Sequence, residues 1–244
     1  MSTDAPPDSG QKPSHEEMRA GQVVPLWRRA AAEALGTGML VAIVVGSGIA
    51  AQQLSPRDTG LMLLENSLAT ALGLSVLIAV FQRLSGAHFN PIVTIADRVL
   101  GARRSAAEIA VYIAAQIAGG IGGAVLANAM FEVPTRISTT DRATAGHLLA
   151  EVVATAGLIM VIFALVRSGR SSVVAPAVGA HIGAAYWFTS STSFANPAVT
   201  IGRIFTDTFA GIAPTSTLPF LGAQIIGAAI GVALTVLLFP SRKD

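Results

Sequence analysis

The sequence predicts an all-α membrane protein, an inverted repeat with six transmembrane helices and two re-entrant half-helices. The first observation is composition: 52% of the 244 residues are hydrophobic, only 12% are charged, and the mean hydropathy is +0.62. The second is length, because six spans of about 20 residues with short connections use up the chain as one domain. The third is an Asn-Pro motif that occurs once in each half.

The chain begins with 26 residues that are rich in Pro, Ser and charged side chains. They hold too little apolar surface to pack, so we expect residues 1–26 to form a disordered cytoplasmic tail. A single membrane domain is expected over residues 27–240, with repeat halves at about 27–130 and 146–240 and a polar connector between them. The apolar runs predict spans at Ala30–Ala51, Leu61–Val80, Ala106–Ala127, Leu148–Leu165, Val173–Phe188 and Leu218–Phe239.

Short helices are expected after each Asn-Pro pair. Proline is tolerated at the first helical position, so Pro91 and Pro197 mark helix starts, with Asn90 and Asn196 as caps. Each helix then runs only about ten residues, ending before Arg98 and Asp207, which is too short to cross a bilayer that needs about 20. Because the two short segments lie at matching places in two hydrophobic halves, they predict half-helices that meet near the membrane centre.

Internal similarity supports the repeat. Ala32–Val41 resembles Ala150–Ile159, and Ala115–Gly120 resembles Ala223–Ala228. Each half holds three spans, an odd number, so the halves enter the membrane in opposite directions. The third span is also rich in glycine, which allows close helix approach in lipid.

The basic residues predict orientation. They are scattered between apolar spans, which argues against a nucleic-acid partner. The expected topology puts twelve of the 16 on the side of the termini and four on the other, which places both termini in the cytoplasm. The four are Arg57, Arg136, Arg142 and Arg203. Cysteine is absent, so disulfides and thiolate metal sites are excluded.

Several polar residues fall within the expected spans and demand an explanation. Glu33 and Glu151 occupy equivalent places, as do Gln116 and Gln224. They form either a proton or ion relay or a set of braces for the re-entrant backbone. His147 is expected at a span end, and His181 either lines a pore or packs within a helix bundle.

These motifs resemble the aquaporin, or major intrinsic protein, family, over about residues 27 to 240. The second box keeps Asn196-Pro197-Ala198, whereas the first reads Asn90-Pro91-Ile92. The resemblance favours the bracing role for the Glu and Gln pairs, makes His88 similar to the family's first-loop histidine, and implies a homotetramer with one pore per subunit. It implies no cofactor and no metal.

The resemblance also implies a second filter formed by four residues. By spacing from the Asn-Pro boxes these are Thr70, Ala184, Ser193 and Val199. All four are small or medium and uncharged, and Val199 stands where the family has arginine. This resembles bacterial members associated with arsenite and polyols, so we expect a wide filter. Arg203, one turn beyond Val199 on the same helix face, either substitutes in part for that arginine or, being about 6 Å further along the axis, lies toward the outer vestibule with Asp207 as its partner.

The expected mechanism is passive. Two helix N-termini, each carrying about half an elementary charge, would repel cations, while the Asn90 and Asn196 amides donate to a passing neutral solute. The sequence therefore predicts a channel in a bilayer, in a bacterial inner membrane, for water, glycerol-like polyols or metalloid hydroxides. A mainly water-conducting pore and a gradient-coupled transporter remain alternatives. Because we find no pair of nucleophile and base and no metal cluster, we expect no enzyme.

Overall fold

The computed structural model describes residues 24–240, so the predicted tail lies almost entirely outside the described residues. Within them the regular structure is helical. The α-helices are α2 (Leu26–Leu54), α3 (Thr59–Phe81), α4 (Pro91–Val99), α5 (Ala106–Met130), α6 (Ala145–Arg167), α7 (Val174–Phe188), α8 (Pro197–Gly202) and α9 (Pro214–Leu238). The short 3-10 helices η1 (Ser171–Val173) and η2 (Arg203–Phe205) precede α7 and follow α8.

Five helices, α2, α3, α5, α6 and α9, are long and apolar enough to cross a membrane. The remaining predicted span, Val173–Phe188, corresponds to α7, which has only 15 residues. At 1.5 Å per residue, α7 rises about 22 Å, and the turn of η1 before it adds about 6 Å. The two half-helices are shorter still, since α4 has nine residues and α8 has six.

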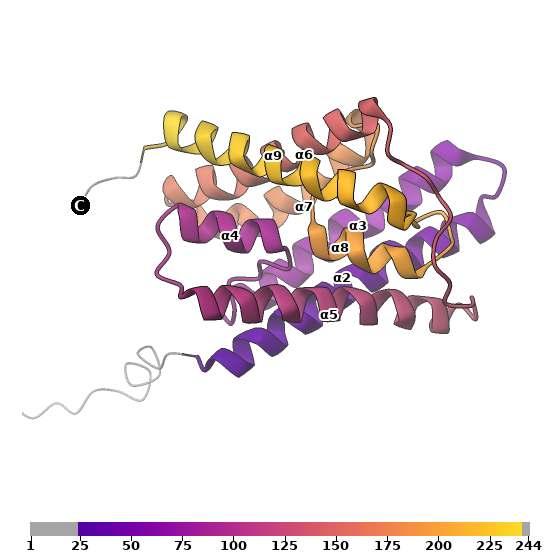
Figure 1. Ribbon diagram of the computed structural model, residues 1–244, viewed down its shortest axis with the longest axis horizontal. Helices are drawn as coiled ribbons and strands as arrows, with labels where there is room; N and C mark the ends of the chain where they lie inside the picture. Colours follow the sequence, from indigo (N-terminus) through magenta and orange to yellow (C-terminus); the bar gives the residue numbers. More distant parts are fainter. Residues whose placement is uncertain (1–23, 241–244) are drawn as a thin grey trace, which may run out of the picture.

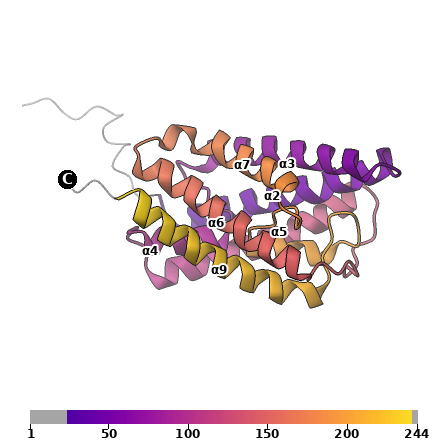
Figure 2. The ribbon, with the colours of Figure 1, turned by 90° about the horizontal axis from the view of Figure 1, so that it is seen from above.

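The helices pack as a bundle around the two half-helices (Figures 1 and 2). In this bundle α2 packs on α5, α6 on α9, and α3 on α7. The half-helices α4 and α8 both contact α5 and α9. The beginning of α2 and the end of α9 lie at the same end of the bundle (Figure 1). We call this the near end, and the opposite end, crossed by the connector 131–144, the far end.

Glycine makes the close packing of α5 on α2 possible. A Cβ on Gly119 would lie 2.1 Å from the Ala34 carbonyl oxygen, and one on Gly123 would lie 2.1 Å from the Gly38 carbonyl oxygen. These glycines therefore let α5 approach the α2 backbone more closely than any larger side chain permits.

The outer surface of the bundle is apolar. Along one face of α3, every fourth residue is a large exposed aliphatic side chain, and α7 and α9 contribute more. A surface of this kind suits lipid or another apolar partner. Members of this exposed set are Leu68, Leu72, Val76, Val80, Trp187, Phe188, Leu218, Ile225 and Leu237.

Candidate functional site: a pore between two half-helices

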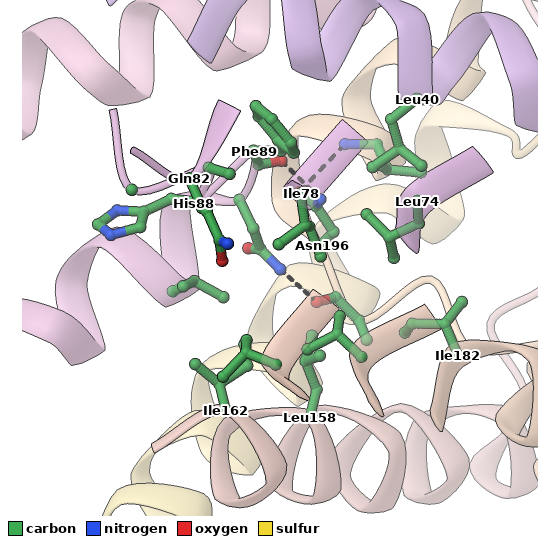
Figure 3. A pocket seen from close by; sticks show the side chains of 18 of the residues that line it. Leu40, Leu74, Ile78, Gln82, His88, Phe89, Leu158, Ile162, Ile182 and Asn196 are labelled. Carbon is green, nitrogen blue, oxygen red and sulfur yellow. Dashed lines mark hydrogen bonds between the residues drawn. The ribbon is translucent and has the colours of Figure 1, made fainter. Parts of the chain in front are cut away.

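The two asparagines tie the half-helices together. The Asn90 side-chain oxygen accepts from the Ile92 backbone N–H at 3.0 Å, and that of Asn196 accepts from the Ala198 N–H at 3.0 Å, so each caps its own helix. Each amide nitrogen also crosses over. Asn90 Nδ2 donates to the Ala195 carbonyl and Asn196 Nδ2 donates to the Phe89 carbonyl, both at 2.8 Å (Figure 3).

Because a side-chain amide has two N–H donors, each asparagine keeps a second one besides its crossing bond. Asn90 and Asn196 both line a central cavity. The free donors and the positive ends of both half-helices therefore belong to the same region of the cavity wall.

The backbone before each half-helix is strained in the same way. Ala87 and Phe89 have φ of 50° each, and Ser193 and Ala195 have φ of 52° and 45°. Left-handed geometry at non-glycine residues costs about 1–3 kcal/mol each and persists only where the surroundings enforce it. The strained segments must therefore be held by other contacts.

Glu33 holds the first segment. Its Oε1 accepts from the Ser85 hydroxyl at 2.6 Å and from the His88 N–H at 3.0 Å, and its Oε2 accepts from the Phe89 N–H at 2.7 Å. The Gln116 side-chain amide completes the set by donating to Oε2 at 2.8 Å. One fully buried carboxylate thus accepts from two backbone N–H groups, those of His88 and Phe89, which lie in non-helical backbone and have no helical acceptor.

Glu151 repeats this arrangement in the second half. Its Oε1 accepts from the Ser191 hydroxyl at 2.7 Å and from the Phe194 N–H at 2.9 Å. Its Oε2 accepts from the Ala195 N–H at 2.9 Å and from the Gln224 amide at 2.7 Å. Both Glu and both Gln side chains therefore occupy bracing positions, and each carboxyl is surrounded by donors rather than by a chain of proton acceptors.

The glutamines also reach the half-helices. Gln116 Nε2 donates to the Thr94 hydroxyl at 2.9 Å, and Gln224 Nε2 donates to the Thr200 hydroxyl at 3.0 Å. Each threonine in turn donates to the carbonyl of its own capping asparagine. The network therefore runs without interruption from the buried carboxylates to the asparagines that line the cavity.

His88 lies at the near end of the same network. Its Nδ1 is 3.1 Å from the Thr94 hydroxyl, and its Nε2 is 3.5 Å from an Asp97 carboxylate oxygen. Arg104 Nε also donates to Asp97, at 3.0 Å. These side chains line the near end of the cavity.

The cavity has a volume of about 610 Å³. The apolar part of its lining comes from α2, α3, α6 and α7 and includes Leu40, Leu74, Ile78, Leu158, Ile162 and Ile182 (Figure 3). The polar part includes the re-entrant backbone around Asn90 and Asn196. A passage lined by both apolar and hydrogen-bonding groups fits solutes that carry both kinds of surface.

Three of the four predicted filter residues line the cavity: Thr70, Ser193 and Val199. The assignment of Ala184 is wrong, because its side chain is exposed on the outside of α7 and does not line the cavity. Tyr186 lines the cavity instead, with its hydroxyl 3.2 Å from Thr70 Oγ1. Two residues along a helix correspond to about 200° of rotation, so the shift exchanges opposite faces of α7.

The expected pairing of Arg203 with Asp207 is also wrong. Arg203 is only 3% exposed and donates from Nε to the Ala210 carbonyl, with its guanidinium carbon 3.5 Å from the centre of the Phe194 ring. Asp207 instead accepts from the Thr139 N–H at 2.9 Å, because the connector folds over the far end. Arg203 is therefore a buried part of the cavity wall and does not pair with Asp207.

Two other histidines of residues 24–240, His147 and His181, lie away from the asparagines. His181 Nε2 is 3.3 Å from the Ala154 carbonyl, and the ring packs against Gly157 and Phe188. Of the two alternatives for His181, the structure therefore gives the packed one. His147 lies in the first turn of α6, near the span end where it was expected, with Nδ1 2.7 Å from the Arg142 carbonyl.

Similarity to known proteins agrees with this architecture. Residues 21–192 match the model of the major intrinsic protein family. Aquaglyceroporin AqpS of Rhizobium meliloti (strain 1021) is 47% identical over 219 residues, covering 89% of this chain and 93% of the relative, and aquaporin-2 of Rattus norvegicus is 31% identical over 235 residues, covering 89% and 81%.

A solved structure shows the same fold. The aquaglyceroporin from Plasmodium falciparum superposes with a TM-score of 0.68 at 21% identity, covering 88% of this chain and 98% of that one. The paired half-helices, the duplicated braces and these similarities lead to one conclusion. This chain belongs to the major intrinsic protein family.

Proposed function

We propose that the pore conducts small polyols such as glycerol, and uncharged metalloid hydroxides such as arsenite, with water as a second permeant. As a family member the chain is a multi-pass membrane channel for water and small solutes. The finer substrate class rests on the filter. Its wall combines the hydroxyls of Thr70, Tyr186 and Ser193 with the isopropyl group of Val199 and carries no formal charge at these four positions.

This wall chemistry favours hydroxylated solutes over water alone. A polyol presents hydroxyls along one edge and C–H groups along the other, and both edges find matching surfaces here. Arsenite, As(OH)₃, offers three hydroxyls of similar reach. Tyr186 makes the filter narrower than the predicted filter with Ala184 would be. Selectivity therefore rests on the combination of hydroxyl and apolar groups in the filter as well as on the width of the filter.

The asparagine donors suit passive conduction of neutral species. A solute that accepts from both Asn90 and Asn196 turns its own donors away from its neighbours in the file, which interrupts a proton wire. The two half-helix ends add positive potential at this point and oppose cations. Neutral solutes then follow their gradient without covalent chemistry.

We further propose a homotetramer in a bacterial inner membrane with both termini in the cytoplasm. The apolar exterior of the bundle and the positive charge at the near end support this assignment. Chemical cross-linking of the purified protein in mild detergent tests the assembly, and a ladder ending at the monomer contradicts it.

The substrate proposal is tested by stopped-flow uptake of water, glycerol and arsenite into proteoliposomes. Wild type is compared with Val199→Arg, which places a cation in the filter, and with Val199→Ile, which keeps it apolar. We expect Arg to lower the glycerol-to-water and arsenite-to-water ratios and Ile to change them little. Unchanged ratios in Val199→Arg would show that the uncharged filter does not set selectivity, which favours the mainly water-conducting alternative.

A further inference from the structure

We propose that Arg203 is a specificity-determining residue of this pore: from one helical turn beyond Val199, its guanidinium supplies a fixed positive charge that rejects protons and other cations while donating to solute oxygens. The inference rests on the pore proposed above and adds, to the opposition to cations at the half-helix ends, a second charge barrier from a residue outside the Asn-Pro boxes and the four filter positions.

Burial and position carry the first step. Arg203 is 3% exposed, yet it lines the same cavity as Ser193 and Val199. A guanidinium group has five N–H donors. Within residues 24–240, Arg203 uses only its Nε–H, which donates to the Ala210 carbonyl. The terminal nitrogens therefore keep donors for a solute that reaches this part of the wall.

Charge balance carries the second step. Within the described part of the chain, no carboxylate lies within 4.0 Å of Arg203. The nearest cationic neighbour increases the imbalance, because the guanidinium carbon of Arg142 lies 5.5 Å from the same Phe194 ring. Arg142 is itself held by the carbonyls of Gly211 and Phe209, at 2.7 and 2.8 Å. Two arginine side chains therefore contact the same ring at the far end, in a poorly hydrated setting where repulsion of cations is strong.

The repeat supplies an internal comparison. Asp97 follows Asn90 by the same interval as Arg203 follows Asn196. At the near end Asp97 is paired, with Arg104 at 3.0 Å and His88 at 3.5 Å. The inverted repeat thus places a partnered anion at one end of the cavity and an arginine without a carboxylate at the other, so a cation meets its charge barrier at the far end.

The test measures proton leak and solute flux in the same proteoliposomes. An entrapped pH dye reports proton entry driven by a valinomycin-set potassium potential, and light scattering reports glycerol and water flux. Arg203→Gln keeps a donor for the loop but removes the charge, and Arg203→Lys keeps the charge. Arg136→Gln removes an exposed arginine of the connector at the same end and serves as the control for net charge.

We expect Arg203→Gln to raise proton leak by about tenfold or more at retained water flux, while Lys at this position and the Arg136 control stay at the wild-type level. Wild-type leak in Arg203→Gln would overturn the inference, as would equal leak in Arg203→Lys, which would point to loop damage. Absence of glycerol flux in wild type would contradict the proposed function, and the leak comparison would still decide the role of Arg203 through the water pathway.

Discussion

Replacement of Glu151 by glutamine tests whether the buried carboxylates hold the pore open. The carboxylate accepts four hydrogen bonds, two on each oxygen, and each oxygen serves one backbone N–H. In Glu151→Gln one oxygen becomes an NH₂ group. Ser191 and Gln224 can reorient to present an acceptor, but the backbone N–H of Phe194 or Ala195 cannot.

The cost follows from that asymmetry. A buried N–H left without an acceptor costs about 1–3 kcal/mol, and loss of the charge weakens the remaining bonds, so we expect a loss of about 2–4 kcal/mol in the free energy of unfolding. The Ala195 carbonyl also accepts a hydrogen bond from the Asn90 side-chain amide in the cavity wall. Displacement of Ala195 should therefore lower solute flux as well.

Unfolding in detergent, followed by circular dichroism in increasing denaturant, measures the effect. Glu132→Gln is the matched control, since Glu132 is exposed on the connector and surface changes of this kind stay within about 0.5 kcal/mol. If Glu151→Gln is as stable as the control, the carboxylate does not hold the strained segment and our explanation of its geometry fails.

Three further predictions follow from other parts of the structure. Asn196→Asp replaces a donor to the Phe89 carbonyl by a carboxylate, so proteoliposome flux should fall or cations should leak, and unchanged values of both would refute the donor role. Gly123→Val would drive a side chain into the Gly38 carbonyl, and folded protein should be lost in size-exclusion chromatography. The hydrogen bond from the Thr139 N–H lowers the pKa of Asp207. This bond therefore stabilises the connector fully at pH values above the ordinary carboxyl pKa, and the stabilisation is lost as the pH falls through the lowered pKa. The protection factors of the connector amides, which correct for the slower intrinsic exchange in acid, should fall at acid pH in wild type and lose that pH dependence in Asp207→Asn.

The repeat and its half-helices were predictable because their signals are local. Asn-Pro fixes a cap and a first helical residue within two positions, and both asparagines cap their helices as expected. The buried Glu and Gln side chains stood out because polar residues in apolar spans need partners. Ser85 and Ser191 were missed as partners of these carboxylates, although they stand at matching distances before Asn90 and Asn196.

The filter was less predictable because it depends on how elements distant in sequence meet. The family resemblance, carried over by spacing from the Asn-Pro boxes, placed Thr70 and Val199 on the cavity wall, whereas the α7 position required the helix rotation, and Tyr186 took the place assigned to Ala184. Arg203 was misjudged because a single residue interval, i to i+4, suggested Asp207 as a partner. Asp207 instead accepts hydrogen bonds from Thr139 of the connector, and the sequence around Asp207 does not indicate this long-range contact.

The central claim, passive conduction of small neutral solutes, is tested most directly by glycerol efflux from proteoliposomes under imposed proton and sodium gradients. Efflux is recorded before and after ionophores collapse both gradients, with protein-free vesicles as the baseline. A channel predicts a rate above the baseline that stays the same when the gradients are removed. Efflux that stops or slows with the gradients would identify a coupled transporter and contradict the account.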